Sequence, residues 1–252
     1  MRPSGVWANL ATLANGAVGV GAVLYALAGN ELWAMLLIVS GIGFDGLDGW
    51  LHRRSGLPGG RFGRVADSVA DAVTFGLAPA TLLLYHPYHA SLWAPFGALS
   101  LLAAVLVATL AIARLVWFTL RAFHHPNFVG APTPQNALGI VALLLFFDVP
   151  AFLGTHPPVV LGVAMALALT MVLPIRFPKM RRGAPLRLPM TVTGVALVAA
   201  LLPLQFGPSP GSWPYETAFA ASAVAAVGIA AYYLVGPWTV PASARAAGSG
   251  AP

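Results

Sequence analysis

Long apolar stretches dominate the hydrophobic pattern of the chain, and polar residues gather in the short segments between them. A helix needs about 20 mostly apolar residues to cross a bilayer. The stretches that meet or approach this length are residues 9–28, 31–51, 66–86, 92–118, 135–153, 157–175, 188–205 and 215–236. The pattern therefore predicts an all-α fold, a polytopic membrane bundle of about eight transmembrane helices.

Composition agrees with a membrane protein. Hydrophobic residues make up 58% of the chain and charged residues 8%, whereas soluble domains carry roughly 25% charged residues. The mean hydropathy is +0.81. Cysteine is absent from the sequence, which excludes disulfides, thiolate nucleophiles and zinc–sulfur sites.

The basic residues lie on one side of the predicted membrane. With eight crossings, all thirteen Lys and Arg residues fall on the side of the N-terminus, and the opposite loops carry none. Positive residues collect on the cytoplasmic side of membrane proteins, so we expect both termini there. Attraction to anionic lipid head groups accounts for the pI near 10.3, and we expect no nucleic-acid partner.

We expect one membrane domain in two parts. Residues 1–186 would form a six-helix core, and residues 187–240 a C-terminal pair of transmembrane helices. The basic hairpin 176–187 would separate them. The tail 241–252 consists of small and polar residues and is predicted to be disordered.

Four of the seven acidic residues lie in one 27-residue stretch, at the facing ends of the second and third apolar segments. They are Asp45, Asp48, Asp67 and Asp71. Residues three or four apart share a helix face, so they form two pairs. Carboxylates at membrane depth are costly and need a neutralising partner. Two facing pairs offer the oxygen ligands that Mg²⁺ or Mn²⁺ prefers, so we expect a divalent-metal site within two helical turns of the cytoplasmic edge.

Structural ion pairs and the ion site of a cation-coupled transporter are the alternative uses of such carboxylates. Transporters place their acids near the bilayer midplane, so a position at the edge favours a metal site. Gly46, Gly49 and Gly63 remove side chains where a ligand's phosphates would approach the backbone. Arg53 and Arg61 suit phosphate oxygens. Metal, glycine and arginine together are typical of phosphoryl transfer.

Residues 45–71 resemble the signature of the CDP-alcohol phosphotransferases, Asp-x2-Asp-Gly-x2-Ala-Arg, then eight or nine residues, then Gly-x3-Asp-x3-Asp. Seven of the eight fixed positions match: Asp45, Asp48, Gly49, Arg53, Gly63, Asp67 and Asp71. The departure is His52, which stands where the family has a small alanine beside the bound nucleotide. An imidazole at this position could stack on the base or point elsewhere.

The resemblance implies a role for each matched residue. The four aspartates would hold two divalent cations, Mg²⁺ or Mn²⁺, that bridge the pyrophosphate of a CDP-linked lipid, and Asp71 would also be the catalytic base. The residues that would line the nucleotide site are Asp45, Asp48, Gly49, Arg53, Gly63 and Asp67. The acceptor oxygen would attack the lipid-bearing phosphorus, and CMP would leave. Homodimerisation is common in the family and is implied in the same way.

Shorter motifs outside the signature resemble the serine-using branch of this family, the serine O-phosphatidyltransferases. Asn9, Thr12 and Asn15 follow its Asn-x2-Thr-x2-Asn spacing. Three further segments resemble its motifs in the same order: residues 113–115, 128–134 and 174–179. The implied reaction is transfer of the phosphatidyl group of CDP-diacylglycerol, or its counterpart from CDP-archaeol, to L-serine. Phosphatidylserine and CMP would be the products.

These short motifs leave alternatives open. Asn15 could bond a neighbouring helix without any further role. Arg114 lies inside an apolar span and needs an anionic partner, which is either the carboxylate of serine or a lipid phosphate. Arg61 and Arg121 are the other candidates for contact with the acceptor or the lipid phosphate. The same chemistry on glycerol 3-phosphate, inositol phosphate or choline therefore also stays open.

Overall fold

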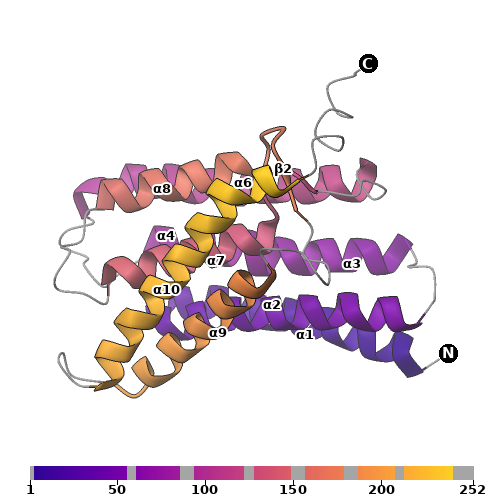
Figure 1. The fold of residues 1–252 in the computed structure, drawn as a ribbon, viewed down its shortest axis with the longest axis horizontal. Coiled ribbons are helices and arrows are strands. Elements are labelled where there is room, and N and C mark those ends of the chain that lie inside the picture. The colour runs from indigo at the N-terminus through magenta and orange to yellow at the C-terminus, as the bar shows by residue number, and fades with distance from the viewer. Residues whose placement is uncertain are drawn as a thin grey trace.

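The computed structural model shows a bundle of helices (Figure 1). It describes residues 3–55, 61–85, 94–121, 128–148, 157–178, 187–207 and 213–240. The α-helices are α1 (Pro3–Leu27), α2 (Glu31–Ser55), α3 (Arg61–Asp71), α4 (Ala78–Tyr85), α6 (Gly97–Arg121), α7 (Thr133–Asp148), α8 (Pro157–Thr170), α9 (Arg187–Leu204) and α10 (Trp213–Val235). A π-helical segment, η1 (Ala72–Leu77), joins α3 to α4, and the 3₁₀ turns are η2 (Ala94–Phe96) and η3 (Gly236–Thr239). Two short strands, β1 (Phe128–Val129) and β2 (Arg176–Phe177), pair antiparallel, with Phe128 opposite Phe177.

Each predicted apolar stretch contains a helix in the described ranges, which confirms the predicted class of fold. The segments α3, η1 and α4 follow one another without a break and form one candidate membrane span, Gly63–Tyr85. Within the described residues, five helices are long and apolar enough to cross a membrane, and α7, α8 and α9 are shorter apolar helices. The five long helices mark the chain as a membrane protein.

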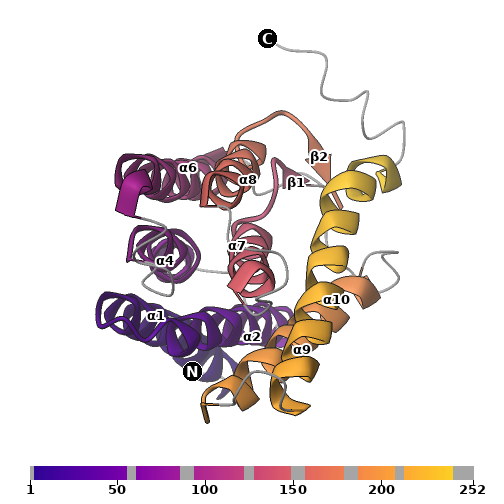
Figure 2. The same cartoon turned by 90° about the vertical axis from the view of Figure 1, so that its left-hand side faces the viewer.

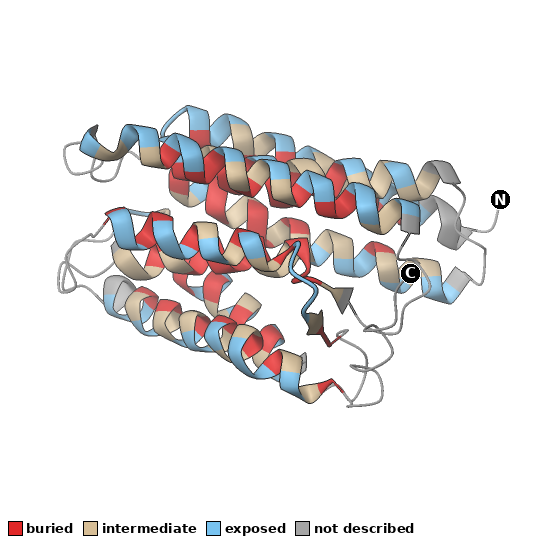
Figure 3. Cartoon of the chain, turned by 90° about the horizontal axis from the view of Figure 1, so that it is seen from above, coloured by how far each residue is buried: buried red, intermediate tan, exposed pale blue. Residues whose placement is uncertain are grey.

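The helix α7 lies in the middle of the bundle. Seen end-on, α4 and α7 lie between α1 and α2 on one side and α6 and α8 on the other, and α10 crosses beside α7 (Figure 2). No residue of α7 from Thr133 to Phe147 is exposed. The outer helices carry buried residues on their inner faces and exposed residues outside (Figure 3). Large apolar side chains such as Leu13, Leu120 and Val227 are at least two-thirds exposed, which suits contact with lipid.

The C-terminal pair packs on the rest of the bundle through both of its helices. The helix α10 contacts α7, and α9 contacts α2. The ring of Tyr232 on α10 stacks on Phe177 of β2, with 5.4 Å between ring centroids. The division between core and pair stays a prediction. The tail 241–252 lies outside the described residues.

The turn before α7 explains one of the short sequence motifs. Gly130 has a φ of +76°, and an added Cβ would overlap the carbonyl oxygen of Met171, so only glycine fits here. Its backbone N–H donates to the carbonyl of Ile175 at 2.8 Å, and that of Ala131 donates to Thr170 at 2.9 Å. These bonds tie the start of α7 to the segment that follows α8.

Three helices meet at close range around Thr74 of η1. A Cβ at Gly19 of α1 would overlap the Thr74 hydroxyl and lie 2.9 Å from its Cα, and one at Gly41 of α2 would overlap its methyl group. Small residues allow such close approach between membrane helices. Thr74 also donates a hydrogen bond to the carbonyl of Asn15 at 2.8 Å. The crossing therefore sets the position of α1 against η1, three residues beyond Asp71.

We expect Gly19→Ala to lower the thermal unfolding midpoint of the purified protein in detergent. The added methyl meets backbone as well as a side chain, and overpacking of this kind costs about 1–3 kcal/mol. Gly162→Ala on α8 is the matched control, because a Cβ there meets nothing within 4 Å. Equal midpoints for the two variants would show that α1 and η1 can separate without cost.

Candidate metal centre

The four aspartates come from α2 and α3, two antiparallel crossings joined at one end of the bundle (Figure 1). Asp45 lies ten residues before the end of α2 at Ser55, and Asp71 lies ten residues after the start of α3 at Arg61. At 1.5 Å of rise per residue, each is about 15 Å from its helix end. Asp45 and Asp71 therefore lie nearly three helical turns from these helix ends, because both helices continue past the apolar stretches through their polar ends. The depth of the cluster in the membrane stays a prediction.

Three of the aspartates converge. Asp45, Asp67 and Asp71 each place one carboxylate oxygen so that all three atoms lie within 4.8 Å of one another. Asp71 is 8% exposed, and one buried oxygen of Asp67 has no hydrogen-bond partner among the described residues. Carboxylates held this close repel one another unless a cation or a proton intervenes. The all-oxygen donor set and the unpartnered oxygen fit a hard divalent cation such as Mg²⁺ or Mn²⁺.

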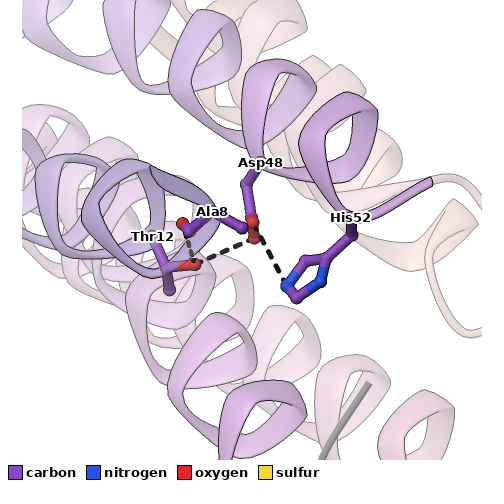
Figure 4. Close-up of polar contacts among 4 residues, drawn as sticks. All are labelled: Ala8, Thr12, Asp48 and His52. Atoms are coloured by element: carbon purple, nitrogen blue, oxygen red, sulfur yellow. Dashed lines mark hydrogen bonds and ion pairs between the residues drawn. The ribbon is translucent and has the colours of Figure 1, made fainter. Parts of the chain in front are cut away.

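Asp48 is placed differently from the other three. It is buried beside Asp67, but both of its oxygens face protein groups (Figure 4). One accepts a hydrogen bond from the Thr12 hydroxyl at 2.9 Å, and the other lies 3.4 Å from Nε2 of His52. His52 thus points toward Asp48, and its position relative to a bound base stays a prediction.

The first helix supplies hydrogen bonds whose acceptors the sequence did not identify. Asn15 is fully buried, and its side-chain amide donates to Oδ1 of Asp71 at 2.9 Å. Thr12, one turn earlier on α1, donates to Asp48. Asn9, the third residue of the same motif, is exposed. The three-residue spacing of Thr12 and Asn15 was the available signal, but it did not reveal which side chains they would meet.

The glycines of the signature differ in their surroundings. A Cβ at Gly46 or Gly63 would meet nothing within 4 Å, so packing among the described residues does not require glycine there. A Cβ at Gly49 would lie 3.2 Å from Nη1 of Arg53. The exposed guanidinium of Arg53 therefore folds back over Gly49. The side chains of Arg61 and Arg121 lie outside the description, and their proposed contacts stay predictions.

Arg114 of α6 joins the same buried region. It is 6% exposed, and Nη1 donates to the hydroxyl of Thr133 at 2.7 Å. Its guanidinium carbon lies 5.8 Å from the centre of the Phe118 ring. It is also close enough to Asp71 to interact with it electrostatically. Asp71 is therefore one of the anionic partners that a buried arginine needs.

The comparison with known families now identifies the class of protein. The sequence model of the CDP-alcohol phosphatidyltransferases matches residues 6–234, most of the chain. The chain belongs to this family. It is therefore an enzyme of phospholipid biosynthesis, as the signature predicted, and family membership removes the transporter alternative.

Several curated relatives of this CDP-alcohol phosphatidyltransferase are named for serine. An archaetidylserine synthase of Methanothermobacter thermautotrophicus is 31% identical over 138 residues, 54% of this chain and 57% of the relative. A CDP-diacylglycerol–serine O-phosphatidyltransferase of Helicobacter pylori is 28% identical over 72% of this chain and 76% of the relative. One of Bacillus subtilis is 30% identical over 69% and 90%. The chain thus spans little more than half the length of the archaeal relative and most of the two bacterial ones.

We expect His52→Ala to tighten the binding of Mn²⁺ by about twofold to fivefold. The imidazole competes for an oxygen of Asp48 that a bound cation would use, and a contact with a side chain more than one-third exposed contributes at most about 1 kcal/mol. Titration of Mn²⁺ followed by electron paramagnetic resonance would measure the change. Weaker binding in the variant would mean that His52 supports the cation and does not compete with it.

Proposed function

We propose that this enzyme transfers the phosphatidyl group of CDP-diacylglycerol, or the equivalent group of CDP-archaeol, to the hydroxyl of L-serine and releases CMP. The observation that carries the chemistry is the convergence of Asp45, Asp67 and Asp71 within 4.8 Å, in a member of the CDP-alcohol phosphatidyltransferase family. Two features support serine as the acceptor: the names of the relatives and the buried Arg114 near Asp71.

The aspartates are proposed to hold two divalent cations, Mg²⁺ or Mn²⁺. When bound, the cations would neutralise the pyrophosphate of the CDP-lipid and stabilise the charge that develops during transfer. Asp71 accepts the proton of the serine hydroxyl. The serine oxygen then forms a bond to the lipid-bearing phosphorus while the bond from that phosphorus to the CMP oxygen breaks. The hydrogen bond from Asn15 holds Asp71 in one orientation, and such positioning is what a weak base most needs.

The nucleotide is proposed to lie beside Gly49 and Gly63. The open space at Gly63 leaves room for a ligand against the backbone, and the exposed guanidinium of Arg53 is available to phosphate oxygens. Arg61 and Arg121 are assigned to the lipid phosphate or to the acceptor. Because the basic residues flank this end of the bundle, we place the site and both termini on the cytoplasmic side. The homodimer expected from the family stays a prediction.

Arg114 is proposed to bind the carboxylate of serine. A guanidinium can pair with a carboxylate through two parallel hydrogen bonds, and Thr133 anchors this one from α7. Ordering the guanidinium before the substrate arrives lowers the cost of binding. The nearby Asp71 would then face the hydroxyl of the same serine molecule.

We expect purified enzyme with CDP-diacylglycerol and Mn²⁺ to release CMP only when serine is the added alcohol, and EDTA to stop the release. Glycerol 3-phosphate, inositol phosphate and choline serve as the competing acceptors. CMP release with another acceptor would refute the assignment to serine and keep the chemistry.

Asp71→Asn should abolish turnover because it removes a charged oxygen ligand and the proton acceptor together. The matched control is Glu216→Gln, which neutralises an exposed carboxylate at the start of α10 and should leave turnover unchanged.

The role of Arg114 can be separated from its effect on folding by comparing serine with ethanolamine, which lacks the carboxylate. We expect Arg114→Gln to raise the KM for serine by about 10- to 100-fold, the effect of losing a hydrogen bond to a charged group. Turnover with ethanolamine, which we expect to be slow in the wild type, should change little in the variant. A rise in the KM for CDP-diacylglycerol, with serine unaffected, would assign Arg114 to the lipid phosphate.

A further inference from the structure

We propose that α1 is a positioning element of the metal centre. In this role, Thr12 and Asn15 each bind one oxygen of one aspartate and so fix the orientation of that carboxylate beside the cations. The proposal rests on the function proposed above only in taking Asp48 and Asp71 as metal ligands. Neither Thr12 nor Asn15 belongs to the signature between residues 45 and 71.

The two hydrogen bonds form a matched pair. Thr12 and Asn15 lie three residues apart, on one face of α1. Thr12 donates to Oδ2 of Asp48 on α2 and Asn15 donates to Oδ1 of Asp71 on α3, each at 2.9 Å. Both donors are at least nine-tenths buried. A single turn of α1 therefore holds one carboxylate from each of the two helices that form the centre.

The position of this turn is itself constrained. The backbone carbonyl of Asn15 accepts a hydrogen bond from Thr74 at 2.8 Å, while its side chain binds Asp71, one turn earlier on the same continuous helical crossing. One turn further along α1, Gly19 packs directly against Thr74. These contacts fix both the rotation and the axial register of α1 against α3 and η1. A short side chain such as that of Asn15 can reach only the carboxylate opposite it.

The chemistry of the donors suits a cation site. A hydroxyl and an amide hydrogen-bond a carboxylate without neutralising it, so the negative charge stays available to the metal. An arginine or lysine in either place would offset that charge and compete with the cation. Outer partners that orient metal ligands in this way typically contribute 10- to 100-fold in metal affinity or activity. Simple packing between helices would affect the stability of the protein and not its affinity for the metal.

The test measures Mn²⁺ affinity by electron paramagnetic resonance, on full-length protein in detergent and without lipid substrate. We expect Thr12→Val and Asn15→Leu each to raise the Kd by about 10- to 100-fold. Thr12→Ser, which keeps the hydroxyl, should restore the affinity to near that of the wild type. Thr193→Val is the matched control: Thr193 is buried on α9 and donates to the carbonyl of Pro189 at 2.9 Å, much as Thr12 also donates to that of Ala8.

Each outcome decides the proposal. Wild-type affinity in Thr12→Val and Asn15→Leu would overturn it and leave the two bonds a role in helix packing alone. An equal loss in Thr193→Val would overturn it as well, since the effect would then be one of general stability. If Asn15→Leu fails to fold, the comparison of Thr12→Val with Thr12→Ser still decides. A wild type that binds no Mn²⁺ would instead refute the proposed metal centre itself, and this inference with it.

Discussion

Mutual repulsion among three carboxylates inside an apolar bundle is the constraint on which the rest of this structure depends. Asp45, Asp67 and Asp71 place their oxygens within 4.8 Å of one another, in helices whose outer faces are suited to lipid. Water cannot solvate such a cluster fully, so the helices must be held together by contacts elsewhere. The tight crossing of Gly19 and Gly41 around Thr74 provides these contacts close to Asp71. The repulsion that remains is what makes the cluster receptive to cations.

The polar neighbours of the cluster divide into neutral and charged groups. Thr12 and Asn15 bind their carboxylates without removing charge. Arg114 is a cation within range of Asp71, and its guanidinium is anchored by Thr133 at the start of α7. That start is set by the left-handed turn at Gly130 and the bonds from its loop to the segment after α8. Residues far from the signature therefore determine how Arg114, the proposed serine-binding residue, lies relative to the aspartates that are the proposed metal ligands.

His52 departs from the family pattern, and its side chain contacts one of the predicted metal ligands. It lies one turn after Asp48 on α2, and its ring reaches back to an oxygen of that aspartate. The other oxygen of Asp48 is taken by Thr12. Both oxygens of Asp48 consequently face protein groups, while Asp45, Asp67 and Asp71 each place one oxygen in the convergent cluster.

The amino-acid sequence by itself determined the helical class of the fold, the membrane setting and the identity of the acidic cluster. These follow from local properties, namely apolar length, charge placement and the three- or four-residue spacing of Asp45 with Asp48 and of Asp67 with Asp71. The distance of Asp45 and Asp71 from their helix ends was not predicted, because α2 and α3 extend beyond their apolar stretches, and a helix does not have to end where its apolar residues do.

Only the tertiary structure decided which groups the carboxylates meet. Thr12 is 36 residues from Asp48, and Asn15 is 56 residues from Asp71. Their pairing depends on the rotation and register of α1 against its neighbours, as the link from Arg114 to Thr133 depends on how α6 meets α7. Rotation and register arise from close packing between whole helices, and no local pattern along the chain encodes them.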